Sequence, residues 1–204
     1  MIHILDYGLG NIQALLNTFK RLGIDASRAR CAAELEGATR LILPGVGAFD
    51  RAIMLLNQSN MRPLLQDMVL TRQVPVLGIC VGMQMLACGS DEGLLPGLNW
   101  LPGHVRAFAN TPASKNLPMP HMGWNNLNLR TGHRLFEDFN PEPSFYFLHS
   151  YYFDAEDKSN VLATTQYGVE FDSIVSMGNI YGIQCHPEKS HHFGAQFLKN
   201  FAVL

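Results

Sequence analysis

The chain has 204 residues, of which 47% are hydrophobic and only 16% charged, and its formal net charge is −2. This length is enough for one domain with a substantial core, and the near-neutral charge excludes the basic surface typical of nucleic-acid-binding proteins. The apolar runs are too short to cross a bilayer. The N-terminus also lacks the basic segment and cleavage site of a signal peptide.

The first ninety residues alternate between predicted strands and predicted helices. Strands are expected at residues 2–5, 24–30, 40–43 and 74–79, and helices or helical turns at residues 11–22, 32–37, 48–57, 61–72 and 81–86. Asn11 has the side chain of a helix N-cap. This alternation is typical of a parallel sheet with right-handed crossovers, in which ligands bind at the carboxyl ends of the strands.

The second half of the chain has a different pattern, with short strands joined by turns. Strands are expected at residues 105–109, 121–124, 126–129, 144–153, 161–167, 173–177 and 180–184, and a closing helix at residues 191–201. Turns at Gly168 and Gly178 predict antiparallel pairing there. We therefore predict a single α/β domain over residues 1–204. It would have an open, mostly parallel sheet flanked by helices and an antiparallel portion in the C-terminal half.

A G-x-C-x-G sequence at residues 78–82 lies where a predicted strand gives way to a predicted helix. In this nucleophile elbow, a strained turn aims the central side chain out of the sheet, and the flanking glycines relieve crowding. The following amide and the helix N-terminus would favour a thiolate and an oxyanion. A buried structural cysteine is the alternative for Cys80 alone. The glycine spacing favours the functional interpretation.

The other three cysteines, Cys31, Cys88 and Cys185, form no CxxC pair and have no zinc-like spacing. A reduced, cytoplasmic protein without a metal site is the expectation.

A candidate base for the thiol stands at the end of the last predicted strand. His186 is followed by Pro187, which prevents the strand from continuing, and by Glu188, which can face the same way as His186. A thiolate nucleophile needs a base, and the base needs an orienting carboxylate. For this tripeptide alone, an ordinary surface turn is the better interpretation. Coupled with the elbow, the tripeptide predicts the set Cys80, His186 and Glu188.

The residues of both motifs resemble the class I (triad) glutamine amidotransferases. Four further stretches narrow the resemblance to the glutaminase subunits of imidazole glycerol phosphate synthases: residues 44–47 (PGVG), 120–125 (PHMGWN), 145–151 (FYFLHSY) and 181–190 (YGIQCHPEKS). The resemblance covers essentially the whole chain. Each motif is only moderately specific, whereas the ordered set is highly specific.

The resemblance implies a role for each matching residue. Cys80 would attack the side-chain amide of glutamine, His186 would pass a proton to the departing ammonia, and Glu188 would orient His186. The oxyanion would bind the amide of Val81 and one from the turn at residues 44–47, near Val46 or Gly47. The glutamine pocket would be lined by Gln84, Glu92, Ser150 and Tyr151. No cofactor is implied.

The resemblance also implies a partner. The ammonia would cross into a separate (β/α)8 cyclase subunit in a heterodimer, which makes imidazole glycerol phosphate and a carboxamide by-product for histidine biosynthesis. Asn11, Trp124 and Lys189 match positions at that subunit interface. The Pro-Gly-x-Gly turn would act as a switch that couples glutamine hydrolysis to the partner. Taken alone, this turn is better explained as an ordinary strand-to-helix turn.

The chain departs from the family pattern at three places. Cys185 stands where phenylalanine is usual, Val81 replaces a common leucine, and His191 and His192 follow the last motif. The two histidines fit a solvated helix start better than a metal site. They also resemble paralogues that feed ammonia, through a cyclase-like partner, to a sugar amidotransferase of surface-polysaccharide synthesis. That alternative, a non-catalytic protein of this fold and a cysteine protease or esterase with the same elbow remain open.

Overall fold

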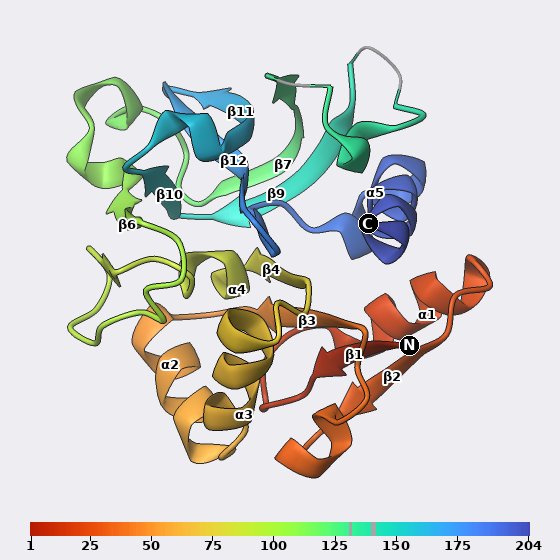
Figure 1. The fold of residues 1–204 in the computed structure, drawn as a ribbon. Helices are drawn as coiled ribbons and strands as arrows, with labels where there is room; N and C mark the ends of the chain where they lie inside the picture. The colour runs from red at the N-terminus through yellow and green to blue at the C-terminus, as the bar shows by residue number, and fades with distance from the viewer. Residues whose placement is uncertain (131, 140–141) are drawn as a thin grey trace.

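The strand–helix alternation of the first ninety residues forms the parallel part of one large sheet in a computed structural model, which describes residues 1–130, 132–139 and 142–204 (Figure 1). This half contains β1 (Ile2–Leu5), α1 (Ile12–Arg21), β2 (Ala26–Ala29), β3 (Arg40–Gly45), α2 (Phe49–Gln58), α3 (Arg62–Gln66), β4 (Val76–Cys80) and α4 (Val81–Gln84). A 3₁₀ turn at Ala32–Leu35 and a π-helical turn at Asp67–Thr71 complete it.

The second half supplies the antiparallel part of the large sheet, one further parallel strand (β13), a separate two-stranded antiparallel sheet (β7 and β9) and the last helix. Its elements are β5 (Gly89–Ser90), β6 (Gly103–Ala107), β7 (His121–Asn126), β8 (Asn128–Leu129), β9 (Ser144–His149), β10 (Tyr151–Ala155), β11 (Val161–Tyr167), β12 (Val169–Met177), β13 (Ile180–Ile183) and α5 (His191–Val203). Most of the expected elements are therefore present, with ends that differ by a few residues.

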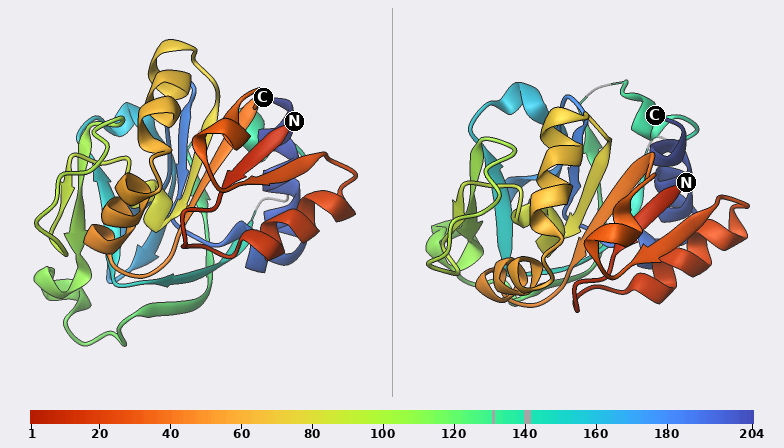
Figure 2. Two further views of the ribbon diagram at one scale, coloured as in Figure 1. Left: turned by 90° about the horizontal axis from the view of Figure 1, so that it is seen from below. Right: turned by 60° about the horizontal axis from the view of Figure 1, so that its bottom comes forward.

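The large sheet has the strand order β2-β1-β3-β4-β13-β12-β10-β6-β5, and β11 pairs with β12 and β8. The strands β2, β1, β3, β4 and β13 are parallel to one another, and β12 begins the antiparallel part. Helices α2 and α3 cover one face of the parallel part, whereas α1 and α5 cover the other (Figure 2). The predicted fold class, an α/β domain with a mixed sheet, is confirmed.

Helix α1 shows why the sequence folds as it does. Its buried face carries Ile12, Leu15 and Phe19, at the three- and four-residue spacing that brings side chains onto one side of a helix. The side chain of Asn11 accepts a hydrogen bond from the Ala14 amide at 3.4 Å, so the expected N-cap is present. None of the helices in the described part of the chain has the length and apolar character needed to cross a bilayer.

Two expected elements differ from the structure. The strand predicted at residues 144–153 is two strands, because the chain leaves the β7–β9 sheet after His149 and joins the large sheet at Tyr151. The helix predicted at residues 81–86 ends at Gln84. Beyond it, the amides of Leu86 and Ala87 bond to carbonyls three residues back, which tightens the chain into a turn.

Candidate active site

Cys80 adopts the strained backbone of a nucleophile elbow. It is the last residue of β4 and has φ 56° and ψ −114°, a backbone conformation that residues other than glycine rarely adopt. Such strain costs about 1–3 kcal/mol and is found chiefly where function requires it. The thiol belongs to a largely buried side chain, with 4% of its surface exposed, and it borders a cavity.

Glycines in the elbow and on the neighbouring strand β3 allow the backbones around Cys80 to come into contact. A Cβ atom on Gly45 would lie 2.6 Å from the Gly82 amide nitrogen, and one on Gly78 would lie 2.6 Å from the Gly82 carbonyl oxygen. Both distances are far below the contact distance of two non-bonded atoms, so neither position accommodates a side chain without movement. The expectation that glycines relieve crowding at this turn is confirmed.

The site lies at the carboxyl edge of three adjacent parallel strands. Gly45, the last residue of β3, pairs with Cys80, and Ile79 pairs with Ile183 at the end of β13. The chain segments that leave these strands therefore meet, as expected for a ligand site in an open α/β sheet. They bring together the turn after β3, the elbow and the segment that carries His186.

His186 and Glu188 form the second half of the site. The Nδ1 atom of His186 lies 3.0 Å from Oε1 of Glu188, and both side chains are buried. Burial lowers the pKa of His186, but hydrogen bonds to Cys80 and Glu188, with the charges of both, outweigh it and raise the pKa to about 10. Because Nδ1 faces the carboxylate, Nε2 is free for the thiol. This geometry suits a thiolate–imidazolium pair.

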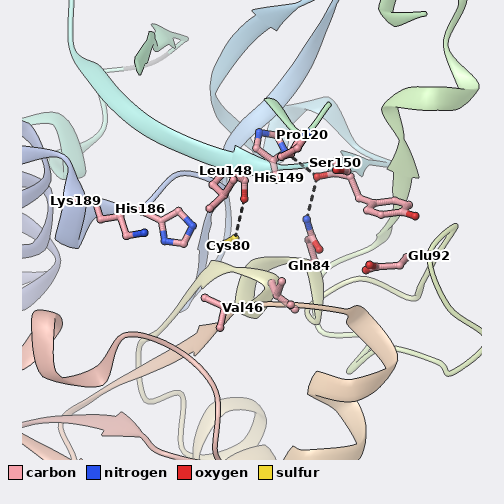
Figure 3. Close-up of a pocket in the computed structure, with 13 residues that line it drawn as sticks. Val46, Cys80, Gln84, Glu92, Pro120, Leu148, His149, Ser150, His186 and Lys189 are labelled. Atoms are coloured by element: carbon pink, nitrogen blue, oxygen red, sulfur yellow. Dashed lines mark hydrogen bonds between the residues drawn. The ribbon is translucent and has the colours of Figure 1, made fainter. Parts of the chain in front are cut away.

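A cavity of about 280 Å³ opens in front of the thiol (Figure 3). Its walls carry Val46, Gly47, Cys80, Val81, Gln84, Glu92, Pro120, Leu148, His149, Ser150, Tyr151, His186 and Lys189. Thus every residue expected at the oxyanion site or in the glutamine pocket borders one cavity. Their roles in binding stay a prediction. Within the described residues, no three His, Cys, Asp or Glu side chains form a group that could hold a metal ion.

The remaining predicted residues lie outside this lining, apart from Lys189. Glu188 stands behind His186, and Trp124 has 49% of its surface exposed and stacks on the His191 ring at 5.0 Å between ring centroids. Asn11 is exposed and caps α1. Lys189 borders the cavity and its Nζ lies 5.5 Å from the centre of the Tyr146 ring.

The turn after β3 is held by a hydrogen bond to the segment that follows β1. The hydroxyl of Tyr7 donates a 2.6 Å hydrogen bond to the Pro44 carbonyl, and β3 continues through Gly45 rather than ending at residue 43 as expected. Beyond it, Gly47 has φ 87°, in the left-handed region that favours glycine. The part of the turn beyond the strand thus begins at Val46 and Gly47, the two residues expected to supply an oxyanion donor.

Sequence reasoning missed several residues at the site. Gln184 places its Nε2 3.8 Å from the Cys80 sulfur, and the Leu148 carbonyl accepts from the thiol at 4.0 Å. His149 borders the cavity and bonds to His121 at 3.0 Å. A polar residue at the end of an apolar strand was the available signal for Gln184. His149 lies in an aromatic strand and His121 in a loop-rich segment, and neither context signals a functional histidine.

Comparison with known proteins places this geometry in a family. Residues 3–204 match the family model described as glutamine amidotransferase class-I. The imidazole glycerol phosphate synthase subunit HisH of Bdellovibrio bacteriovorus is 54% identical, and subunit HisH 2 of Pseudomonas aeruginosa is 41% identical. Both alignments cover all of each chain.

Solved structures show the same fold at lower identity. A crystal structure of a glutamine amidotransferase has a TM-score of 0.73 and 21% identity, and the match covers 100% of this chain and 99% of the other. One chain of the PurLQS structure from Thermotoga maritima has a TM-score of 0.71 and 16% identity, with coverage of 98% and 96%.

Proposed function

Because the chain belongs to the class-I glutamine amidotransferase family, we propose that it is the glutaminase subunit of an imidazole glycerol phosphate synthase. The observation that carries the proposal is the pair Cys80 and His186 at one cavity, with the buried Glu188 behind His186, in a chain similar over its whole length to HisH subunits.

The reaction begins at the thiolate. The sulfur of Cys80 attacks the side-chain carbonyl carbon of glutamine, and the carbonyl oxygen becomes an oxyanion. The amides of Val81 and of Val46 or Gly47 would stabilise it, since all three residues border the cavity. His186 then donates its Nε2 proton to the departing nitrogen, which leaves as ammonia. Its other nitrogen is held by Glu188.

Water completes the cycle. His186, now neutral, takes a proton from a water molecule, which attacks the thioester, and glutamate leaves as the Cys80–substrate bond breaks. The buried carboxylate of Glu188 stabilises the imidazolium in both halves of the reaction. The Gln84, Glu92, Ser150 and Tyr151 groups on the cavity wall would bind the amino-acid end of glutamine.

We propose that ammonia passes to a (β/α)8 cyclase subunit in a heterodimer, and that the complex acts as a lyase in the cytoplasm. Exposed apolar side chains support a docking partner: Val46 borders the cavity, and Met119, Met122 and Trp124 lie on the segment around Pro120, which also borders it. Patches of this kind on a protein surface mark interaction sites. All four cysteines are unpaired, which suits a reducing compartment.

Glutamine hydrolysis by the purified chain, with and without its cyclase partner, tests the proposal. We expect glutamate release, covalent labelling of Cys80 by diazo-oxo-norleucine, and a large rise in rate with the partner and its ligand. Cys80→Ala should abolish both hydrolysis and labelling, whereas Cys31→Ala, a change at an exposed thiol, should not. A wild-type chain that neither hydrolyses glutamine nor takes the label would overturn the glutaminase assignment.

Growth of a histidine auxotroph that lacks its glutaminase subunit tests the pathway. Rescue supports imidazole glycerol phosphate synthesis. Failure to rescue by a chain with glutaminase activity would instead favour supply of ammonia to a sugar amidotransferase.

A further inference from the structure

The side chain of Gln184 contacts the reacting sulfur from inside the protein. It follows the last strand residue of β13, none of its surface is exposed, and its Nε2 lies 3.8 Å from Cys80 Sγ. Hydrogen bonds to the large sulfur atom are longer than those to oxygen, and sulfur is a better acceptor as a thiolate than as a thiol. The orientation of the Gln184 side-chain amide decides whether its N–H groups or its oxygen face the sulfur.

A backbone carbonyl fixes that orientation. The Tyr151 carbonyl can only accept, so Gln84 presents its Nε2 to it at 3.0 Å. The same Nε2 donates to Gln184 Oε1 at 3.1 Å. A reversed Gln184 amide would place two donors against each other there. The oxygen of Gln184 is therefore held by Gln84, and its N–H groups face the sulfur of Cys80.

The Tyr151 carbonyl is itself held from the other side. His149 donates from Nδ1 to it at 2.8 Å, so His149 Nε2 is an acceptor and takes the Nδ1 proton of His121 at 3.0 Å. Asn125 in turn donates to His121 Nε2 at 3.2 Å and to the Gln166 carbonyl at 3.0 Å. Every donor thus meets an acceptor while both imidazoles are neutral. These hydrogen bonds together fix which atom is donor and which is acceptor at every step from Asn125 to the Gln184 amide beside the thiol.

We propose that Gln184 is a further catalytic residue, whose amide N–H stabilises the Cys80 thiolate. The inference rests on the glutaminase function proposed above. The sulfur is negative before it attacks glutamine and again when the thioester breaks. The Gln184 donor therefore assists hydrolysis of the thioester most, because in that step the thiolate is the leaving group. No bond to Gln184 forms or breaks.

The ionisable groups that interact with Cys80 are His186, Tyr7 and Cys185, and the charged or titratable side chains of Glu92, His149 and Lys189 border the same cavity. His186 bonds to it and carries the positive charge, with Glu188 on the far side of the ring. Burial raises the pKa of Tyr7 and of the Cys185 thiol well above their usual ranges, so both are neutral near pH 7. The Gln184 amide is thus a side-chain donor that faces the sulfur without carrying charge.

The test is the pH dependence of Cys80 alkylation by iodoacetamide in the isolated chain, followed at the Cys80 peptide by mass spectrometry. Gln184→Met keeps the length of the side chain and removes the donor. We expect its alkylation midpoint to move up by about one pH unit, because the thiolate loses a hydrogen bond that the neutral thiol accepts only weakly. Turnover should fall about tenfold with little change in KM for glutamine.

Gln184→Glu provides the second variant, since it keeps the shape of the side chain and replaces the donor by a carboxylate. Its midpoint should rise further than that of the methionine variant. Gln66→Met and Gln66→Glu, at an exposed position of α3, are the matched controls and should leave the midpoint unchanged. Folding of each variant is checked by its thermal unfolding.

An unchanged or lowered midpoint in a folded Gln184 variant would overturn the proposal, and if the methionine variant does not fold, the glutamate variant decides. Alkylation requires no glutamine. If Gln184 does not stabilise the thiolate, the wild type should still hydrolyse glutamine. If the glutaminase assignment is wrong, the alkylation midpoints still show whether Gln184 stabilises the thiolate.

Discussion

The carboxylate of Glu92 caps helix α2, because its Oε2 accepts a hydrogen bond from the Phe49 amide at 2.9 Å. Ala48, the residue at the N-cap position, has no side chain that could do so. Phe49 lies only two residues after Gly47. A residue on the wall of the cavity therefore also holds the helix that follows the candidate oxyanion turn, and its two functions can be separated by substitution.

Glu92→Gln should keep the cap and lose the charge. We expect its free energy of unfolding to lie within about 0.5 kcal/mol of the wild type, while KM for glutamine rises about tenfold or more because a charged partner of the substrate ammonium is gone. Glu92→Ala should show the same change in KM and a further loss of about 1 kcal/mol in stability. Urea unfolding and steady-state kinetics measure both. Equal destabilisation of the two variants would contradict the capping role.

Glu188→Gln should lower the pKa of His186. The imidazolium loses its buried counter-charge, so its pKa should fall from about 10 toward the ordinary value, and the alkaline limb of the pH–kcat profile should move to lower pH. Turnover should drop by roughly 10³–10⁴. Glu156→Gln, at an exposed carboxylate, is the control. An alkaline limb that stays in place would show that Glu188 does not set the protonation of the base.

Gly82→Ala should strongly destabilise the protein. A Cβ at this position would overlap the Leu43 carbonyl oxygen on β3, and both partners are backbone that cannot rotate away. We expect a loss of about 3 kcal/mol or more in the free energy of unfolding. Gly132→Ala, where nothing lies within 4 Å, should change it by less than about 1 kcal/mol. Similar unfolding midpoints in urea for both variants would refute the close approach of the two segments.

Acid should destabilise the protein through the His121–His149 pair. Burial lowers the pKa of His121 to about 4 and that of His149 to about 3, whereas both are near 6.5 in the unfolded chain. Between these values the unfolded state binds more protons, so this part of the stability is present above pH 6.5 and is lost as pH falls toward 4.

The histidine prediction is checked by urea unfolding at several pH values. His121→Phe should be less stable at pH 7, because His149 loses its partner, but its stability should decline less steeply with acid. His192→Gln, at an exposed histidine, should keep the wild-type slope. The same slope in His121→Phe as in the wild type would assign the acid sensitivity to other groups.

The sequence predicted the parallel part of the fold well, because its signals are local. Alternating apolar runs and glycine turns define β1, β3, β4 and the elbow at Cys80 without reference to the rest of the chain. The pairing of His186 with Glu188 was also predictable, since a proline and a two-residue spacing fix their relation.

The break between β9 and β10 could not be predicted in the same way. The run from residue 144 to 153 is rich in aromatic residues on both sides of Ser150, and nothing within it marks the change of sheet there. A distant group helps to hold the break, since the Tyr151 carbonyl accepts a hydrogen bond from Gln84, 67 residues earlier in the chain. The contact of Gln184 with the thiol depends on the same long-range network.

The position of β13 between β4 and β12 has a consequence for the order in which reactivity arises. Cys80 is synthesised about a hundred residues before His186, and the strand that delivers the histidine can pair with β4 only after the ribosome has released it. Contacts so distant in sequence form late in folding. During synthesis the thiol therefore lacks its base, and the nascent chain carries an unactivated cysteine until its last strand is in place.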